Sequence, residues 1–189
     1  MTDRVGTPAF RASVSHTLKR EGVFANDAND SGGPTLYGVA SNIWPEWYDH
    51  IASEPDTAKR IEIAIEFYHV NFWEKLHLDE LHSTRIAVEI FDTAVNGGLW
   101  RAAKIAQQAA NLYYRARGYG QFLKEDGVFG PITRKAINDI SRKYAENLDG
   151  MLNYFQAEFY MSLFDANPAK YGDFIIGWFR RVQTHGDLD

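Results

Sequence analysis

The sequence of 189 residues contains no cysteine. Disulfide bonds, thiolate metal sites and a cysteine nucleophile are therefore excluded. No stretch approaches the ~20 apolar residues that a membrane-spanning helix needs. The N-terminal residues 1–8 also lack the apolar run of a signal peptide. We expect a protein that is made in the cytoplasm and does not insert into a membrane.

Basic residues are not in excess, since the formal net charge is −5. A partner with a phosphate backbone needs a basic surface, so no nucleic-acid partner is expected. The six histidines do not fall at metal-ligand spacing, because His77 and His82 are five residues apart and no acidic pair completes a zinc site. We expect neither a metal ion nor another cofactor.

The apolar fraction of 45% fits a folded chain, and the apolar residues recur at steps of three or four. The pattern predicts a mainly α fold of about seven helices, over residues 10–21, 57–72, 86–95, 102–113, 131–144, 152–163 and 174–182. A short irregular hairpin is expected near residues 32–43. We expect one compact unit over residues 1–189, with its best internal boundary at residues 118–130.

Glu21 extends the apolar face of the first helix, and Gly22 then favours the turn that ends it. Burial against apolar neighbours and the negative end of a helix both raise the pKa of a carboxyl group, burial by more. A carboxyl group held neutral near neutral pH can protonate a leaving glycosidic oxygen. The alternative is a surface residue at a helix end.

The polar loop after Glu21 starts like a calcium-binding loop at Asp27, but its twelfth position is Gly38 and lacks the required acid. An ordinary turn rich in Asn and Asp remains open. In the catalytic interpretation Asp30, or less favourably Asp27, is the ionised partner carboxylate and Thr35 helps to hold a water. Gly32-Gly33 lets the backbone approach a substrate, and Tyr37 offers its ring or hydroxyl to a sugar.

Together these residues follow the motif Glu-Gly-(x)₇-Asp-x-Gly-Gly-x-Thr-x-x-Gly-Val, which resembles the signature of glycoside hydrolase family 108, N-acetylmuramidases of phage endolysins and bacterial secretion systems. The similarity continues through Phe72-Trp73, residues 91–98, Gln107-Gln108, residues 126–133 and residues 177–182. Residues 126–133 resemble the core motif of the peptidoglycan-binding region that follows the hydrolase part in this family. The resemblance implies a lysozyme-like catalytic part over residues 8–98 and a helical peptidoglycan-binding part over residues 99–189.

The resemblance implies that Glu21 is the catalytic acid in cleavage of the β-1,4 bond between N-acetylmuramic acid and N-acetylglucosamine. Val23 and Phe24 depart from the family pattern Glu-Gly-Gly-Tyr, which puts nearby substrate contacts in doubt. Asp92 and Asn96 lie four residues apart, so both can face one side of a helix and bind an acetamido group. Helix capping or packing explains them equally well.

Trp73 is either a core residue, a groove wall or a sugar platform. The polar loop is suited to hold a water rather than to attack the sugar, which favours an inverting course. A lytic transglycosylase, which needs one acid and no activated water, remains an alternative, as does a non-catalytic wall-binding or phage structural module. We expect a monomer that acts on the cell wall and that a separate holin-type pore releases.

Overall fold

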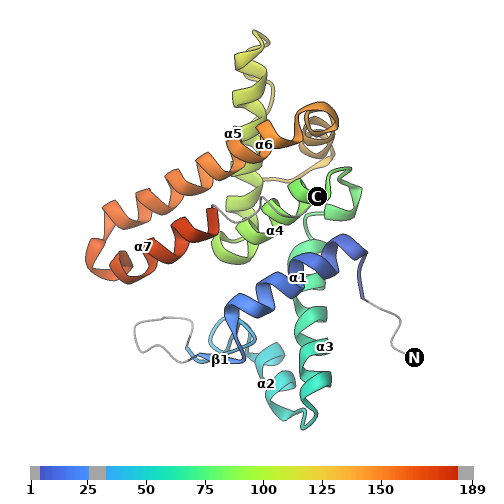
Figure 1. Ribbon diagram of the computed structural model, residues 1–189, viewed down its shortest axis with the longest axis vertical. Helices are drawn as coiled ribbons and strands as arrows, with labels where there is room; N and C mark the ends of the chain where they lie inside the picture. The colour runs from blue at the N-terminus through green and yellow to red at the C-terminus, as the bar shows by residue number, and fades with distance from the viewer. Residues whose placement is uncertain (1–4, 26–32, 183–189) are drawn as a thin grey trace. The chain divides into compact units, whose positions relative to one another are not determined.

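The computed structural model of the chain describes residues 5–25 and 33–182 (Figure 1). The described residues form seven α-helices and one small antiparallel sheet, which confirms the mainly α class expected from the sequence. The chain divides into two compact units, Met1–Lys75 and Leu76–Asp189, which are described one at a time. The functional boundary that we place between residues 98 and 99 stays a prediction.

The first unit contains three α-helices, a π-helical turn and three short strands. Their bounds are α1 Pro8–Glu21, β1 Phe24–Ala25, β2 Thr35–Leu36, β3 Val39–Ala40, α2 Pro45–Ser53, α3 Thr57–Tyr68 and the π-helical turn His69–Trp73. Asp56 caps α3, because its carboxylate accepts hydrogen bonds from the amides of Ala58 and Lys59. Helix α2 is an element that the apolar pattern does not predict. It is only nine residues long, too short for a clear helical period.

The core of the first unit is aromatic. The rings of Phe10, Phe67, Tyr68 and Trp73 are each at most 1% exposed. The Phe10 ring of α1 lies 5.4 Å from the Trp73 ring, centroid to centroid, so the first helix packs on the turn that follows α3. This contact fixes the helix that ends at Glu21.

The second unit is helical throughout its described part. Its elements are a 3₁₀ turn Leu78–Glu80, α4 Thr84–Gly97, α5 Leu99–Ala116, α6 Pro131–Ala166 and α7 Pro168–Val182. Helix α6 packs against α4, α5 and α7, and α7 runs back along the second half of α6 (Figure 1). Its core is built of small and aliphatic side chains, among them Ala106, Ile137 and Leu148, all at 0% exposed.

Two predicted helices, residues 131–144 and 152–163, are joined in α6. The backbone at Tyr144 leaves helical angles (φ −135°, ψ 40°), so the long element consists of two helices across a kink. Helix α7 begins at Pro168, six residues before the predicted start. Asn167 explains this difference, because its side-chain oxygen accepts a hydrogen bond from the amide of Lys170 and caps the new helix.

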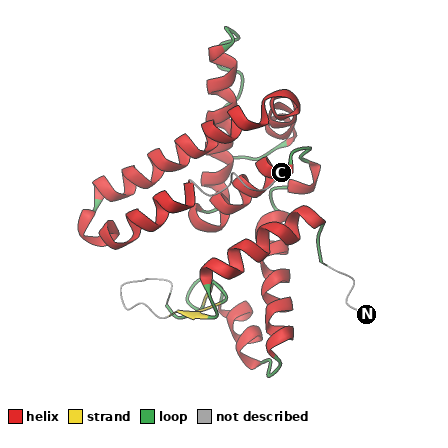
Figure 2. Ribbon diagram, viewed as in Figure 1, coloured by secondary structure: helices red, strands yellow, loops and turns green. Residues whose placement is uncertain are grey.

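The expected hairpin near residues 32–43 is present as β2 and β3, and the added strand β1 completes a three-stranded sheet (Figure 2). Of the helices in the described residues, none combines the length and apolar character that crossing a bilayer requires.

Candidate active site

Helix α1 ends at Glu21, and the backbone conformation of the next residue explains why. Gly22 donates its amide hydrogen to the carbonyl oxygen of Leu18 at 3.3 Å, N to O. Its angles (φ 69°, ψ −174°) fall in a region that is open essentially to glycine alone, rather than in the left-handed helical region. The chain therefore leaves the helix immediately after Glu21. The side chain of Glu21 lies outside the described part of the structure.

Thr35 lies in the central strand of the sheet that follows α1. It pairs with Ala25 of β1 on one side and with Ala40 of β3 on the other. The side chain is partly exposed, as a water-holding hydroxyl would have to be. Asp30, the expected ionised partner, and Asp27 fall outside the described residues. The catalytic roles of all these groups stay predictions.

Tyr37 and Gly38 form the two-residue turn between β2 and β3. Both have positive φ values, 51° and 79°, which is the geometry of a type I′ turn and matches the twist of the two strands. The amide of Tyr37 donates to the carbonyl oxygen of Val23 at 3.0 Å, and its own carbonyl accepts from the hydroxyl of Tyr68 at 2.9 Å. The turn is thus tied both to the end of α1 and to α3.

Tyr37 is only 4% exposed, so in this structure its visible contribution is to hold the hairpin. Trp73 is likewise 1% exposed and packs against Phe10. From the sequence Tyr68, like Trp73, is either a core residue, a groove wall or a sugar platform, and the structure shows it as a buried anchor of this turn. A contact of Tyr37 or Trp73 with substrate stays a prediction.

Gly33 precedes the sheet with a positive φ of 72°. A Cβ atom at this position would lie 2.8 Å from Nδ2 of Asn42 and 2.9 Å from Oγ of Ser41. The close approach of the loop to these two side chains therefore requires glycine for packing alone. The expectation that the backbone at Gly32-Gly33 approaches a substrate stays a prediction.

Val23 and Phe24, the two departures from the family pattern, are among the most exposed apolar residues of the first unit, at 59% and 60%. Val23 follows Gly22, and Phe24 is the first residue of β1. An exposed apolar pair beside a candidate catalytic residue is available for contact with a ligand. The sequence identified these positions only as departures.

Asp92 and Asn96 lie one turn apart on α4 of the second unit, as their spacing predicts. Asp92 is 5% exposed, and Asn96 donates from Nδ2 to the backbone carbonyl oxygen of Asp92 at 2.7 Å. On the same helix, the hydroxyl of Thr93 accepts a hydrogen bond at 2.8 Å from Nε2 of the fully buried Gln156 of α6. This part of α4 is therefore a rigid polar segment.

Two side chains of α5 organise the loop of residues 117–130. Nε2 of Gln107 donates to Oδ1 of Asp126 at 2.9 Å, and Oε1 of Gln107 accepts from the amide of Gly127 at 2.9 Å. Asn111 accepts at Oδ1 from the amides of Phe122 and Leu123 at 3.1 and 2.8 Å. These bonds hold residues 122–127 against α5.

The hydrogen bond from Gln107, followed by that from the amide of Val128, lowers the pKa of Asp126 below its usual value. Burial raises the pKa of the neighbouring Tyr114 hydroxyl, with a smaller contribution from the negative charge of Asp139. Asp126 is therefore ionised and Tyr114 neutral at neutral pH. The described residues contain no group of three or more His, Asp or Glu that could hold a metal ion.

Comparisons with known proteins agree with this architecture. Residues 14–98 match the family described as glycosyl hydrolase 108, and residues 101–183 match the family described as a predicted peptidoglycan domain. No curated protein matches the chain. Among solved structures, SagA of Brucella abortus is similar with a TM-score of 0.66 at 22% sequence identity, over 93% of this chain and 90% of that chain. At this identity the similarity to SagA shows the fold.

Proposed function

Because the chain belongs to the glycosyl hydrolase 108 family, we propose that it is an N-acetylmuramidase. It is a glycoside hydrolase that acts on peptidoglycan, and therefore on the bacterial cell wall. The bond that we assign to it is the β-1,4 linkage between N-acetylmuramic acid and N-acetylglucosamine.

We assign the general acid to Glu21. The observation that supports this most strongly is the end of α1, where Gly22 takes a backbone conformation that other residues avoid and directs the chain into the sheet. Such a conformation costs free energy in other residues and is often found at functional sites. Glu21, the residue immediately before Gly22, is the glutamate that the family resemblance identifies.

In the proposed reaction Glu21 transfers its proton to the oxygen of the leaving sugar as the glycosidic bond breaks. Asp30 accepts a proton from a water held by Thr35, and the water oxygen forms the new bond to the anomeric carbon. The configuration at that carbon is inverted, and one water is consumed for each bond cleaved. The hairpin that contains Thr35 is anchored at Tyr37, so its strands are fixed before substrate binds.

We propose substrate-binding roles for four residues, two in each unit. Asp92 and Asn96 of α4 contact the acetamido group of a sugar. Tyr37 and Trp73 act from their buried positions, where they fix the shape of the hairpin and of the turn after α3. We further propose that the protein acts as a monomeric bacteriolytic enzyme of the phage endolysin type, released by a separate holin-type pore and without a nucleic-acid partner.

Mass spectrometry of digested peptidoglycan tests the reaction. Hydrolysis adds one water to each product and creates a reducing end, whereas a lytic transglycosylase forms a 1,6-anhydro ring with no added water. We expect reducing N-acetylmuramic acid ends. Anhydro products would identify the transglycosylase instead, and binding to the wall without any cleavage would identify a non-catalytic module.

A further inference from the structure

Three hollows follow one another on the surface of the second unit, around the first turns of α6. Their volumes are about 270, 280 and 430 Å³. The first and second hollows share Phe122, Pro131 and Ile132. The second and third share Pro131, Lys135 and Asp139. The hollows therefore form one continuous surface, which we call the α6 groove.

One end of the α6 groove is apolar and exposed. Phe122 is 61% exposed and Ile132 is 70% exposed. The Phe122 ring packs against the ring of Tyr114 at 4.9 Å between centroids, and its backbone amide is held by Asn111. Exposed apolar groups held in place in this way are typical of binding surfaces, because little ordering is needed when a ligand binds.

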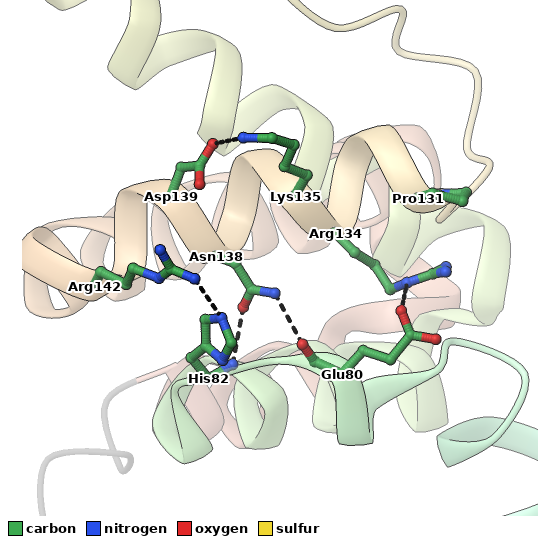
Figure 3. Close-up of a pocket in the computed structure, with 8 residues that line it drawn as sticks. All are labelled: Glu80, His82, Pro131, Arg134, Lys135, Asn138, Asp139 and Arg142. Carbon is green, nitrogen blue, oxygen red and sulfur yellow. Dashed lines mark hydrogen bonds and ion pairs between the residues drawn. The ribbon is translucent and has the colours of Figure 1, made fainter.

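The other end of the α6 groove is polar and carries three cationic side chains (Figure 3). Arg134 and Lys135 each bond to a carboxylate, Glu80 and Asp139 respectively. Arg142 instead lies 2.8 Å from Nε2 of His82, Nη2 to Nε2. A guanidinium group only donates, so the bond to His82 leaves Arg142 without a carboxylate partner in this hollow. The three cations and two carboxylates that line this end carry a formal net charge of +1.

The positions of His82 and Arg142 are well defined. The amide of His82 donates to Oδ1 of Asn138 at 2.8 Å, and Nδ2 of Asn138 donates to the carbonyl oxygen of Glu80 at 2.8 Å (Figure 3). Asn138 thus connects the segment before α4 to α6 and places the imidazole beside the exposed Arg142. Arg142 keeps donor hydrogens for a carboxylate ligand, to which a planar guanidinium can bond twice.

We propose that the α6 groove binds peptidoglycan as a sugar together with its attached peptide. The apolar end takes the C–H face and acetamido methyl group of an N-acetyl sugar on Phe122 and Ile132. The cationic end takes a carboxylate of the stem peptide at Arg142. This inference rests on the proposed function and assigns a second contact region, within the segment that matches the predicted peptidoglycan domain.

The two ends together favour this ligand over simpler ones. A neutral glycan would use the apolar end alone, and a free anion would use only the cationic end. Peptidoglycan joins an uncharged N-acetyl sugar to a peptide with carboxylates, so its two chemistries match the two ends of the groove. Peptidoglycan binding should therefore depend on both ends of the groove, whereas binding of a peptide-free glycan should depend on the apolar end alone.

The test uses the full chain with the substitution Glu21→Gln, so that no ligand is cleaved. It measures the binding affinity for two ligands. One is a soluble muramyl peptide, and the other is an uncharged N-acetylglucosamine oligomer, a glycan without peptide or carboxylate. Phe122→Ala should weaken binding of both ligands by roughly fivefold or more. Arg142→Gln should weaken binding of the muramyl peptide by roughly tenfold and leave the peptide-free glycan unaffected. In two-dimensional NMR spectra, the amide signals of Phe122 and Arg142 should shift on addition of the muramyl peptide.

Matched controls lie on the same unit away from the groove. Tyr154→Ala removes an aromatic side chain that is 58% exposed, and Lys170→Gln removes an exposed positive charge. Neither should change binding. Ile132→Ser provides a second groove variant at a site so exposed that folding should not depend on it.

Unchanged affinity in the Phe122, Ile132 and Arg142 variants, or equal losses of both ligands with Arg142→Gln, would overturn the proposal. The rate of wall hydrolysis by the chain with Glu21 intact is measured separately. A chain that binds through the groove but does not hydrolyse the wall would contradict the enzymatic assignment and support the groove.

Discussion

Gln107 and Asp126, nineteen residues apart in sequence, are joined by a hydrogen bond of 2.9 Å between Nε2 and Oδ1. Gln107 is 2% exposed, and its amide group also bonds to the carbonyl oxygen of Val128 and the amide of Gly127. One side chain therefore holds the end of the loop that leads into α6. The α6 groove depends on this arrangement, since Phe122 and Pro131 flank the same turn.

Replacing Gln107 with leucine should lower the free energy of unfolding of the second unit by about 2–3 kcal/mol, because it leaves buried polar groups of the loop without partners. Chemical denaturation of the two proteins measures the difference. The matched control is Gln108→Leu, at the adjacent and less buried position, which should change stability little. Equal effects at the two positions would show that the hydrogen bonds of Gln107 are not the cause.

The lowered pKa of Asp126 predicts a pH dependence of stability. Its ionised form is favoured in the folded state, first by the bond from Gln107 and then by that from Val128. The resulting stabilisation is present above the ordinary pKa of an aspartate and is lost as the pH falls through the lowered pKa of the folded state. Asp126→Asn should therefore be less stable than the native chain at pH 7, and the difference should shrink in acid. Denaturation curves at several pH values test this, and a constant difference would contradict it.

Alanine substitutions at Gly127 and Gly120 should distinguish backbone strain from a steric clash in the same loop. Both have positive φ, 74° and 73°. A Cβ atom at Gly127 would overlap the indole ring of Trp100, whereas at Gly120 nothing lies within 4 Å. Gly120→Ala should cost about 1 kcal/mol for backbone conformation alone, and Gly127→Ala should cost about 1–3 kcal/mol more because the Trp100 ring must move. Thermal unfolding of the two variants compares them, and equal losses would rule out the steric contribution.

The hydroxyl of Tyr68 should stabilise the hairpin of the candidate active site. It donates to the carbonyl oxygen of the buried Tyr37 at 2.9 Å. Tyr68→Phe keeps the ring and leaves that oxygen without its bond, at a cost of about 1–2 kcal/mol. Amide hydrogen exchange of residues 35–40 should become faster, while Tyr48→Phe on α2 should leave it unchanged. Exchange that accelerates equally throughout the first unit would show a global effect instead.

The sequence predicts well those elements whose signals are local. Gly22 marks a helix end through its backbone freedom, and α1 ends there as the sequence predicts, although its ψ of −174° is not that of the left-handed turn common at helix ends. The joining of two predicted helices at Tyr144 depends on tertiary packing, since no proline or glycine marks the kink. Helix α2 is too short to produce a clear period.

In the candidate sites, too, the residues with local sequence signals are predictable and those brought together by tertiary packing are not. Glu21 and Thr35 belong to a motif of fixed spacing, so the sequence can identify them. Part of the α6 groove is lined by the motif of residues 126–133, but His82, Phe122 and Arg142 lie outside it, far apart in the chain and ordinary in type. The bond to Asn111 places Phe122, and the bonds of His82 to Asn138 and Arg142 place the other two on the same surface. Their shared role could be inferred only from the structure.

The clearing of a turbid suspension of purified peptidoglycan tests the central claim most directly. We expect the native chain and the control Glu46→Gln, which alters an exposed acid of α2, to clear it at similar rates. Glu21→Gln, which cannot donate the proton, should clear it roughly a hundredfold more slowly or not at all while keeping the native circular dichroism spectrum. Clearing by folded Glu21→Gln at a rate near that of the native chain would contradict the assignment of Glu21 as the catalytic acid.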